Sequence, residues 1–160
     1  GQGRRAKGII YSYEEFIIRR GPILFAEKTM ENKTLRPLQQ KSFRFGVDAY
    51  NVCSQIMKIK NEWILTRQLM RSATAVGALI SESEHAQSVP DFISKRAIAR
   101  KECNESKYWI ALMREVEILE PSIACKLNDQ AEELMRLLTA GIKTAQRNLL
   151  TTTKKGTGSK

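Results

Sequence analysis

The chain has 160 residues, 42% of them hydrophobic and 28% charged, which is the composition of one globular domain. No stretch approaches the roughly 20 consecutive apolar residues that a membrane helix needs, and the basic N-terminus lacks the apolar run of a secretory signal. We therefore expect a soluble, cytoplasmic protein with no membrane partner.

The net charge of +10 is concentrated at the two ends of the chain. Residues 1–40 contain eight Lys or Arg and four Glu, and residues 151–160 add three Lys and no acid. Residues 41–150 hold 16 basic and 13 acidic residues. Basic tails bind polyanions without sequence preference, through release of condensed counterions, but they also occur on surfaces that are merely solvated. Charge alone therefore leaves nucleic-acid binding open.

The apolar residues between Ser42 and about residue 150 recur at alternating steps of three and four, which predicts four amphipathic helices. The first helix has Phe45, Ala49, Val52, Ile56 and Ile59 on one face, and the second has Leu65, Leu69, Ala73, Val76 and Ile80. Asn61, at the break between them, is a suitable N-cap for the second helix.

Ser88, followed three residues later by Asp91, predicts the start of the third helix through a capping box. That helix runs to about Val116 and carries two stripes. One stripe is apolar except for two acids and comprises Ile98, Glu102, Glu105, Trp109, Leu112 and Val116; the other is basic and comprises Arg96, Arg100, Lys107 and Arg114. After a break at residues 120–122, a fourth helix carries Leu127, Ala131, Leu134, Leu138, Gly141 and Ala145.

Steps that average 3.5 residues are typical of helices that pack nearly parallel with interlocking side chains. The connections are short, so successive helices should run antiparallel. The sequence thus predicts an all-α protein, an up-down-up-down four-helix bundle over residues 41–150. Residues 1–40 form an N-terminal extension or arm, and residues 151–160 a polar, basic tail. Met30 is a natural start for a bundle protein, so residues 1–29 are either an upstream extension or an arm that packs on a neighbouring subunit.

Residues 68–78 (QLMRSATAVGA) resemble a segment of the family called four helix bundle protein, whose members are often encoded in intervening sequences of bacterial large-subunit ribosomal RNA genes. The similarity continues at residues 91–93 (DFI), 101–102 (KE), 105–109 (ESKYW) and 137–145 (LLTAGIKTA), and covers roughly residues 41–148. The Glu-x-x-Glu-x-x-Tyr-Trp run of the third helix is its most specific part.

This resemblance implies an antiparallel bundle that assembles into a barrel-shaped homopentamer. A related branch comprises the accessory variability proteins of diversity-generating retroelements, which are basic pentamers that bind a reverse transcriptase and its RNA or DNA. Some positions depart from the family pattern. Leu79 replaces a usual Asn, Gly141 a branched aliphatic residue, and Arg96 and Arg100 replace apolar residues. The two arginines either create a basic surface or lie at a wet interface.

No arrangement of residues predicts catalysis, a metal or another cofactor. Glu82 and His85 have the Glu-x-x-His spacing of di-iron bundles, but such a site needs two of these motifs and His85 is the only histidine. Cys53, Cys103 and Cys125 are too widely spaced for a zinc knuckle, and a thiol in a helical apolar pattern behaves as a small hydrophobe. We expect a protein that is not an enzyme.

Glu102 and Glu105 stand out because a carboxylate on an apolar stripe is costly unless it is paired. Arg71, in the middle of the second helix, is the expected partner, with Tyr108 and Ser72 as hydrogen-bond donors. We interpret these five residues as a polar cluster that fixes helix register or subunit pairing. A general acid–base pair and exposure at a subunit surface are the alternatives.

The basic stripe of the third helix is joined by three cations of the fourth, at steps of seven and four. We expect these side chains to form the nucleic-acid-binding surface, with a merely solvated charged face as the alternative: Arg96, Arg100, Lys107, Arg114, Arg136, Lys143 and Arg147. The predicted function is a homo-oligomeric, pentameric scaffold that binds RNA or DNA nonspecifically, as an accessory to a nucleic-acid enzyme such as a reverse transcriptase. A structural or protein-interaction bundle without a nucleic-acid role is the alternative.

Overall fold

The computed structural model describes residues 36–156, which form four helices and, within this range, no strand. The helices are α2 (Pro37–Lys60), α3 (Ile64–Ser83), α4 (Val89–Glu115) and α5 (Pro121–Gly156). The predicted arm therefore lies almost wholly outside the described residues. The first helix begins at Pro37, before the expected Ser42, and α5 continues through the segment predicted as a tail to Gly156.

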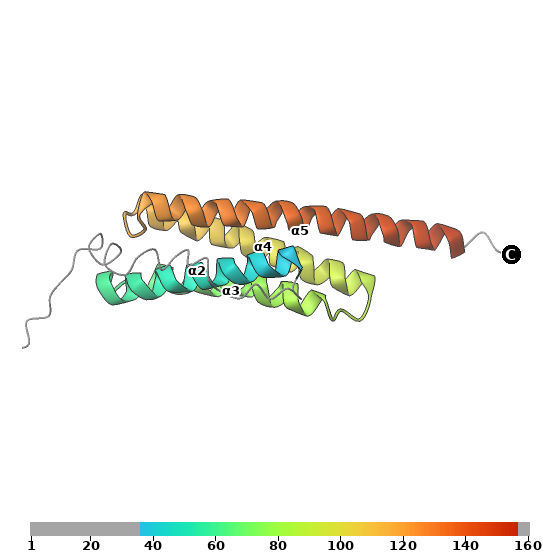
Figure 1. Ribbon diagram of the computed structural model, residues 1–160, viewed down its shortest axis with the longest axis horizontal. Coiled ribbons are helices and arrows are strands. Elements are labelled where there is room, and N and C mark those ends of the chain that lie inside the picture. Colours follow the sequence, from blue (N-terminus) through green and yellow to red (C-terminus); the bar gives the residue numbers. More distant parts are fainter. Residues whose placement is uncertain (1–35, 157–160) are drawn as a thin grey trace, which may run out of the picture. The chain divides into compact units, whose positions relative to one another are not determined.

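The four helices pack as an antiparallel up-down-up-down bundle (Figure 1). Each helix contacts the next one along the chain, and α5 returns to α2 through an interface smaller than those between successive helices. The predicted all-α, four-helix architecture is thus confirmed. At 36 residues α5 is about 54 Å long, against about 40 Å for the 27 residues of α4, and it continues past the other helices at its C-terminal end.

The core consists of the apolar stripes predicted for three of the helices. Phe45, Ala49, Val52 and Ile56 of α2 are fully or almost fully buried, as are Leu69, Ala73, Val76 and Ile80 of α3 and Leu127, Ala131, Leu134 and Leu138 of α5. Where α2 meets α3 the backbones come close, and a Cβ built on Gly77 would lie 3.5 Å from the Ser42 carbonyl oxygen. This is an ordinary van der Waals distance, so the Cβ of an alanine at Gly77 would touch the α2 backbone without forcing the helices apart.

The stripe predicted to face the core from the third helix is not the one that does. Of the predicted stripe, Ile98 in α4 and Val116 just after it are exposed and the other four residues are half-buried, whereas the buried positions lie one residue around the helix. They are mainly small or flexible: Arg96, Ala99, Cys103, Ser106, Ile110 and Met113. The small residues on this buried face let α4 approach α3 and α5 closely.

The helix ends use different residues from those expected at one junction. Asn61 does not cap α3; it ends α2 in the left-handed conformation, with φ 53°. Instead, the Glu62 carboxylate accepts hydrogen bonds from the backbone N–H groups of residues 64, 65 and 66 at 2.9–3.0 Å. Burial raises the pKa of Glu62, but these hydrogen bonds outweigh it and lower the pKa overall. At α4, Ser88 Oγ accepts from the Asp91 N–H as predicted, at 3.2 Å.

Two of the three thiols are packing groups. Burial raises the pKa of Cys53 and of Cys103 to about 12, and the Cys103 thiol donates to the Ala131 carbonyl oxygen at 3.3 Å. Cys125 is exposed.

We expect only Cys125 to react with a thiol reagent at pH 8 in the folded protein. The thiolate is the reactive form, and the raised pKa values keep Cys53 and Cys103 protonated at that pH. Mass spectrometry should count one labelled thiol in the folded protein and three labelled thiols after denaturation. Rapid labelling of Cys53 or Cys103 in the folded state would contradict the packing described here.

Candidate functional site

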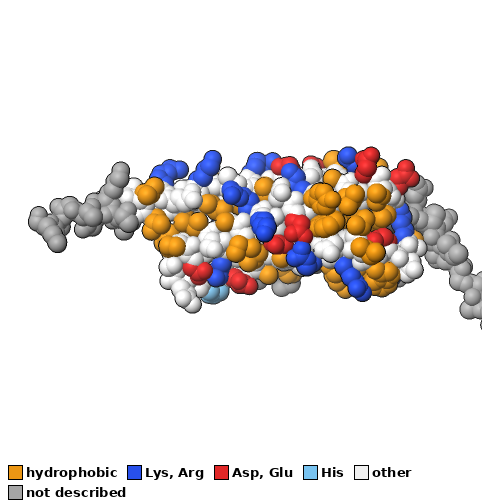
Figure 2. Space-filling model, turned by 180° about the vertical axis from the view of Figure 1, so that it is seen from behind, with side chains coloured by type: hydrophobic (Ala, Val, Ile, Leu, Met, Phe, Trp, Pro, Cys, Tyr) orange, Lys and Arg blue, Asp and Glu red, His pale blue; other side chains and the backbone are white. Residues whose placement is uncertain are grey.

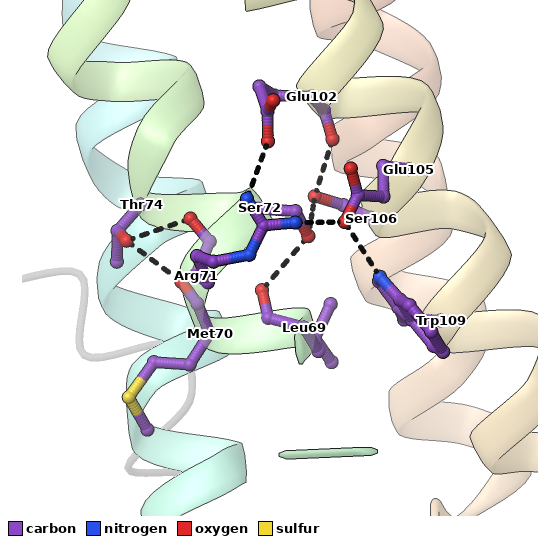
Figure 3. Close-up of polar contacts among 9 residues, drawn as sticks. All are labelled: Leu69, Met70, Arg71, Ser72, Thr74, Glu102, Glu105, Ser106 and Trp109. Atoms are coloured by element: carbon purple, nitrogen blue, oxygen red, sulfur yellow. Dashed lines mark hydrogen bonds and ion pairs between the residues drawn. The ribbon is translucent and has the colours of Figure 1, made fainter. Parts of the chain in front are cut away.

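A polar cluster joins the middle of α3 to α4 (Figure 3). Arg71 reaches from α3 to Glu105, with which its Nη2 forms an ion pair, and its Nη1 lies 3.9 Å from Glu102 Oε2. The Trp109 indole N–H donates to the same Glu105 oxygen at 3.1 Å. The structure thus brings together the predicted cation and both predicted carboxylates, and it adds Trp109, which the sequence suggested only as a packing residue.

The two predicted hydroxyl donors do not reach the carboxylates. The Ser72 hydroxyl donates to the Leu69 carbonyl oxygen, at 3.3 Å, and the Ser106 hydroxyl lies 2.9 Å from Ser72 Oγ. Tyr108 is 58% exposed and its ring packs edge-on against that of Trp109. The sequence analysis therefore missed Ser106 as a member of the cluster. Ser106 follows Ala99 by seven residues, and this spacing could have indicated that the two residues share one face of the helix.

This cluster is structural in character. Arg71 is 59% exposed at its side chain, whereas Glu102 and Glu105 are 15% and 27% exposed. The guanidinium therefore lies over the junction of α3 and α4 and covers the two acids from the solvent side. The buried Ser72–Ser106 pair lies beneath it, so both contacts join α3 to α4.

Arg96 is not part of a basic surface, contrary to the sequence-based expectation. Only 8% of the residue is exposed. Its Nε donates to Ser83 Oγ at 3.2 Å, its Nη2 pairs with Glu84 at 2.8 Å, and its guanidinium carbon lies 4.3 Å from the centre of the Phe92 ring. Burial is possible because α5 has Gly141 opposite, where an added Cβ would come within 3.0 Å of Arg96 Nη1.

The other predicted cations divide into paired and unpaired side chains. Lys107 forms an ion pair with Glu132 of α5, which lowers the pKa of that glutamate. The remaining five form no ion pair with a carboxylate within residues 36–156: Arg100, Arg114, Arg136, Lys143 and Arg147. Arg100 is half-buried and the other four are exposed. Figure 2 shows basic side chains following one another along the edge that α5 forms.

A buried acid on α2 escaped the sequence analysis. Asp48 is completely buried, and its Oδ2 accepts from Arg44 Nε at 3.0 Å and from Gln130 Nε2 of α5 at 2.8 Å. Asp48 lies beside the apolar stripe of α2, on the side that α5 covers. The spacing of the apolar residues therefore did not predict that it is buried. This contact joins α2 to α5, as does the ion pair between Lys41 and Glu133.

The described part of the chain offers no metal-binding cluster. No group of three or more His, Cys, Asp or Glu side chains within it could hold a metal ion. His85 is exposed in the α3–α4 connection. The four helices also include none with the length and apolarity to span a membrane.

The fold and the buried polar contacts define an antiparallel four-helix-bundle protein of the all-α class. The family model for the 23S rRNA-intervening sequence protein matches residues 37–140, so the chain belongs to this family. The chain is also similar to a crystal structure from Bacteroides thetaiotaomicron, described as a protein of unknown function from the S23 ribosomal protein family. The two are 36% identical with a TM-score of 0.65, over 66% of this chain and 98% of that one. A comparison with curated proteins gave no match.

We expect Glu105→Gln to lower the free energy of unfolding by about 1 kcal/mol, because the amide loses the charged contact with Arg71. Glu102→Gln should cost less, since Glu102 Oε2 accepts no hydrogen bond and its cation is 3.9 Å away. Urea denaturation, with mass measurement in solution, checks both. Glu115→Gln, at an exposed position of the same helix, is the control. A role in helix register is contradicted if neither cluster variant changes stability or oligomeric state.

Proposed function

We propose that this protein is a non-enzymatic helical scaffold that binds RNA or DNA through the phosphate backbone, along the edge that α4 and α5 share. The observation that carries the proposal is the row of exposed cations on this edge, none of which forms an ion pair with a carboxylate within residues 36–156: Arg136, Lys143 and Arg147. Several cations at helix interfaces are by contrast tied to an acid, as Lys41 is to Glu133 and Lys107 is to Glu132.

Two contacts define how this edge is built. Lys107 pairs with Glu132, and Arg96 lies against Gly141, which sets the antiparallel register of α4 on α5. In that register Arg100 lies level with the α5 turn between Arg136 and Lys143. On α5, Glu132 and the three exposed cations follow one another at steps of four, seven and four residues, so they lie on the same stripe. The cations span about 17 Å at 1.5 Å per residue.

The chemistry of this edge suits a polyanion without sequence preference. Phosphate contacts position a nucleic acid but carry no sequence information, which is read at base edges. The exposed aromatic residues Phe43, Tyr50, Trp63 and Tyr108 belong to α2, α4 and the α2–α3 connection, and none lies on α5, so the α5 stripe offers no stacking platform. Binding should therefore depend on charge and on salt concentration.

Self-association would strengthen such weak contacts. An apolar groove of about 340 Å³ lies between α2 and α3, lined by Phe43, Gly46, Val47 and Tyr50 on one side and by Gly77 and Ala78 on the other. Phe43 is 62% exposed, and large exposed apolar patches mark interaction sites. Five copies, the number that the family resemblance implies, would carry a net charge of about +50 and gain avidity.

The partner proposed for the assembly is a nucleic-acid enzyme such as a reverse transcriptase, by analogy with the related accessory proteins. The α2–α3 groove equally supports the second candidate, a bundle that binds only other proteins or copies of itself. The two candidates differ in one measurable property, which is affinity for RNA and its dependence on salt.

We expect the triple variant Arg136→Gln/Lys143→Gln/Arg147→Gln to bind single-stranded RNA more weakly than the unchanged protein. Each phosphate neutralised contributes roughly 0.7 to the slope of log affinity against log salt, so the slope should fall by about 2 per chain engaged. Fluorescence anisotropy with a labelled RNA, at several salt concentrations, measures both quantities.

The matched control is Lys58→Gln/Arg67→Gln/Lys101→Gln, which removes the same charge from exposed cations elsewhere on the bundle. It should retain most of the affinity. Equal losses in the two triple variants would show that total charge, and not the α5 stripe, determines binding. No RNA binding by the unchanged protein would favour the second candidate.

We expect Phe43→Glu to weaken self-association and so to lower the molar mass of the assembly in solution. A carboxylate in the α2–α3 groove would have to be desolvated when the subunits assemble. Ile64→Glu, at a residue 76% exposed outside the groove, should leave the mass unchanged. Light scattering coupled to gel filtration gives both masses. A single-chain mass for the unchanged protein, or an unaltered mass for Phe43→Glu, would rule out this interface.

A further inference from the structure

A hollow of about 410 Å³ lies on the stripe of exposed cations that follows α5. Its lining comes from this one helix: Met135, Arg136, Thr139, Ala140 and Lys143. Arg136 and Lys143 are seven residues apart, which is about two turns of an α-helix, so they border the hollow at its two ends along the helix axis. The short side chains of Thr139 and Ala140 lie between them. A ligand group that enters the hollow therefore meets a cation on either side.

No acid balances these two cations within the hollow. Neither Arg136 nor Lys143 forms an ion pair with a carboxylate within residues 36–156, and no acid belongs to the lining. Glu132 and Glu133, in the turn before Arg136, are each paired with a cation of another helix. The pKa of Glu132 is lowered mainly by its contact with Lys107, and Arg136 contributes less. The lining therefore carries two positive charges that are available to an anion.

The Thr139 hydroxyl is a hydrogen-bond donor without a partner in the described part of the chain. A threonine inside a helix can donate its hydroxyl to a carbonyl oxygen of the preceding turn. The other threonine side chains that the structure describes all do so, at 2.7–3.0 Å: Thr66, Thr74, Thr144 and Thr151. Thr139 is half-buried and forms no such bond with a described residue. A donor of this kind can be satisfied by an oxygen of a ligand.

Two cations and a free hydroxyl are groups that proteins use to hold a phosphate. An arginine can donate two parallel hydrogen bonds to phosphate oxygens, and a lysine attracts the group as a point charge. Threonine hydroxyls also donate to phosphate oxygens in nucleic-acid interfaces. Arg147 lies one turn beyond Lys143 on the same stripe and outside the lining, where it can meet the next phosphate of a strand. This continuation favours a phosphate within a nucleic-acid backbone over a free one.

We propose that this hollow anchors one backbone phosphate of an RNA or DNA strand, between Arg136 and Lys143, with the Thr139 hydroxyl as the hydrogen-bond donor. This role of the hollow rests on the proposed function and adds a defined contact to it. Attraction by the cations weakens as salt rises, whereas the hydrogen bond from an uncharged hydroxyl does not enter the salt slope. Thr139 is thus a binding residue that the distribution of charge does not reveal.

The test measures the affinity of Thr139→Val for a labelled single-stranded RNA at several salt concentrations, by fluorescence anisotropy. Valine has nearly the shape of threonine but cannot donate, so this variant should bind about fivefold more weakly, the order of magnitude of one hydrogen bond to a charged group. The slope of log affinity against log salt should stay the same, because no charge is removed. Thr144→Val, whose hydroxyl already donates to the Ala140 carbonyl oxygen outside the hollow, is the control and should keep the full affinity.

Ala140→Leu tests the hollow itself without a change to any polar group. Leucine at this exposed position fills the space between Arg136 and Lys143 and leaves every charge in place, so RNA binding should weaken several-fold at an unchanged slope. Ala111→Leu, the same change at an exposed position of α4 outside the hollow, should bind RNA as the unchanged protein does. Circular dichroism establishes that each variant is folded.

Inorganic phosphate, titrated at constant ionic strength, distinguishes a backbone phosphate from a free one. Phosphate should displace the labelled RNA only at concentrations far above those at which RNA binds, and displacement at similar concentrations would overturn the proposal. Equal RNA affinity in Thr139→Val, Ala140→Leu and their controls would also overturn it, while salt-dependent binding would still uphold the nucleic-acid role of the α5 stripe. No RNA binding by the unchanged protein would overturn both.

Discussion

Four helices share one apolar interior here, and a few of the polar side chains that enter this interior are bonded to a side chain of a neighbouring helix. Ser72 meets Ser106 between α3 and α4, and Asp48 meets Gln130 between α2 and α5. Arg96 of α4 finds Glu84 just after α3. Apolar contacts alone tolerate sliding by a turn, because one Leu or Ala replaces another at little cost. An unpaired buried polar group does not, so these few contacts fix the register of the bundle.

The same pairing determines which charges remain available to a partner. Arg71, Lys107 and Arg96 each occupy a place at a helix interface and each is held by a carboxylate. The cations of the outer α5 stripe are left without such a partner in the part of the chain that the structure describes. The proposed nucleic-acid surface therefore consists of basic residues that form no ion pair within the bundle. This distinction is invisible in the net charge, which counts both groups alike.

The helix α5 has two faces with different chemistry. One face presents Arg136, Lys143 and Arg147 at the edge shared with α4, and the other borders a cavity at the α3–α4 connection through Gly141, Thr144 and Ala145. Arg96 and Gly141 lie together where α4 meets α5, and a Cβ added at Gly141 would lie 3.0 Å from Arg96 Nη1.

The sequence by itself determined the class of fold, the number of helices and the core stripes of α2, α3 and α5, because steps of three and four leave one apolar face on each helix. It also indicated that Glu102 and Glu105 need Arg71, since a carboxylate on an apolar stripe demands a cation. Tertiary structure alone decided which of two stripes on α4 faces inward, because close packing favoured the small residues Ala99, Cys103 and Ser106 over larger apolar ones. It also decided that Arg96 is buried, because its guanidinium occupies the space beside Gly141, which is far along the chain. The periodicity within one helix carries no information about the shape of the helix packed against it.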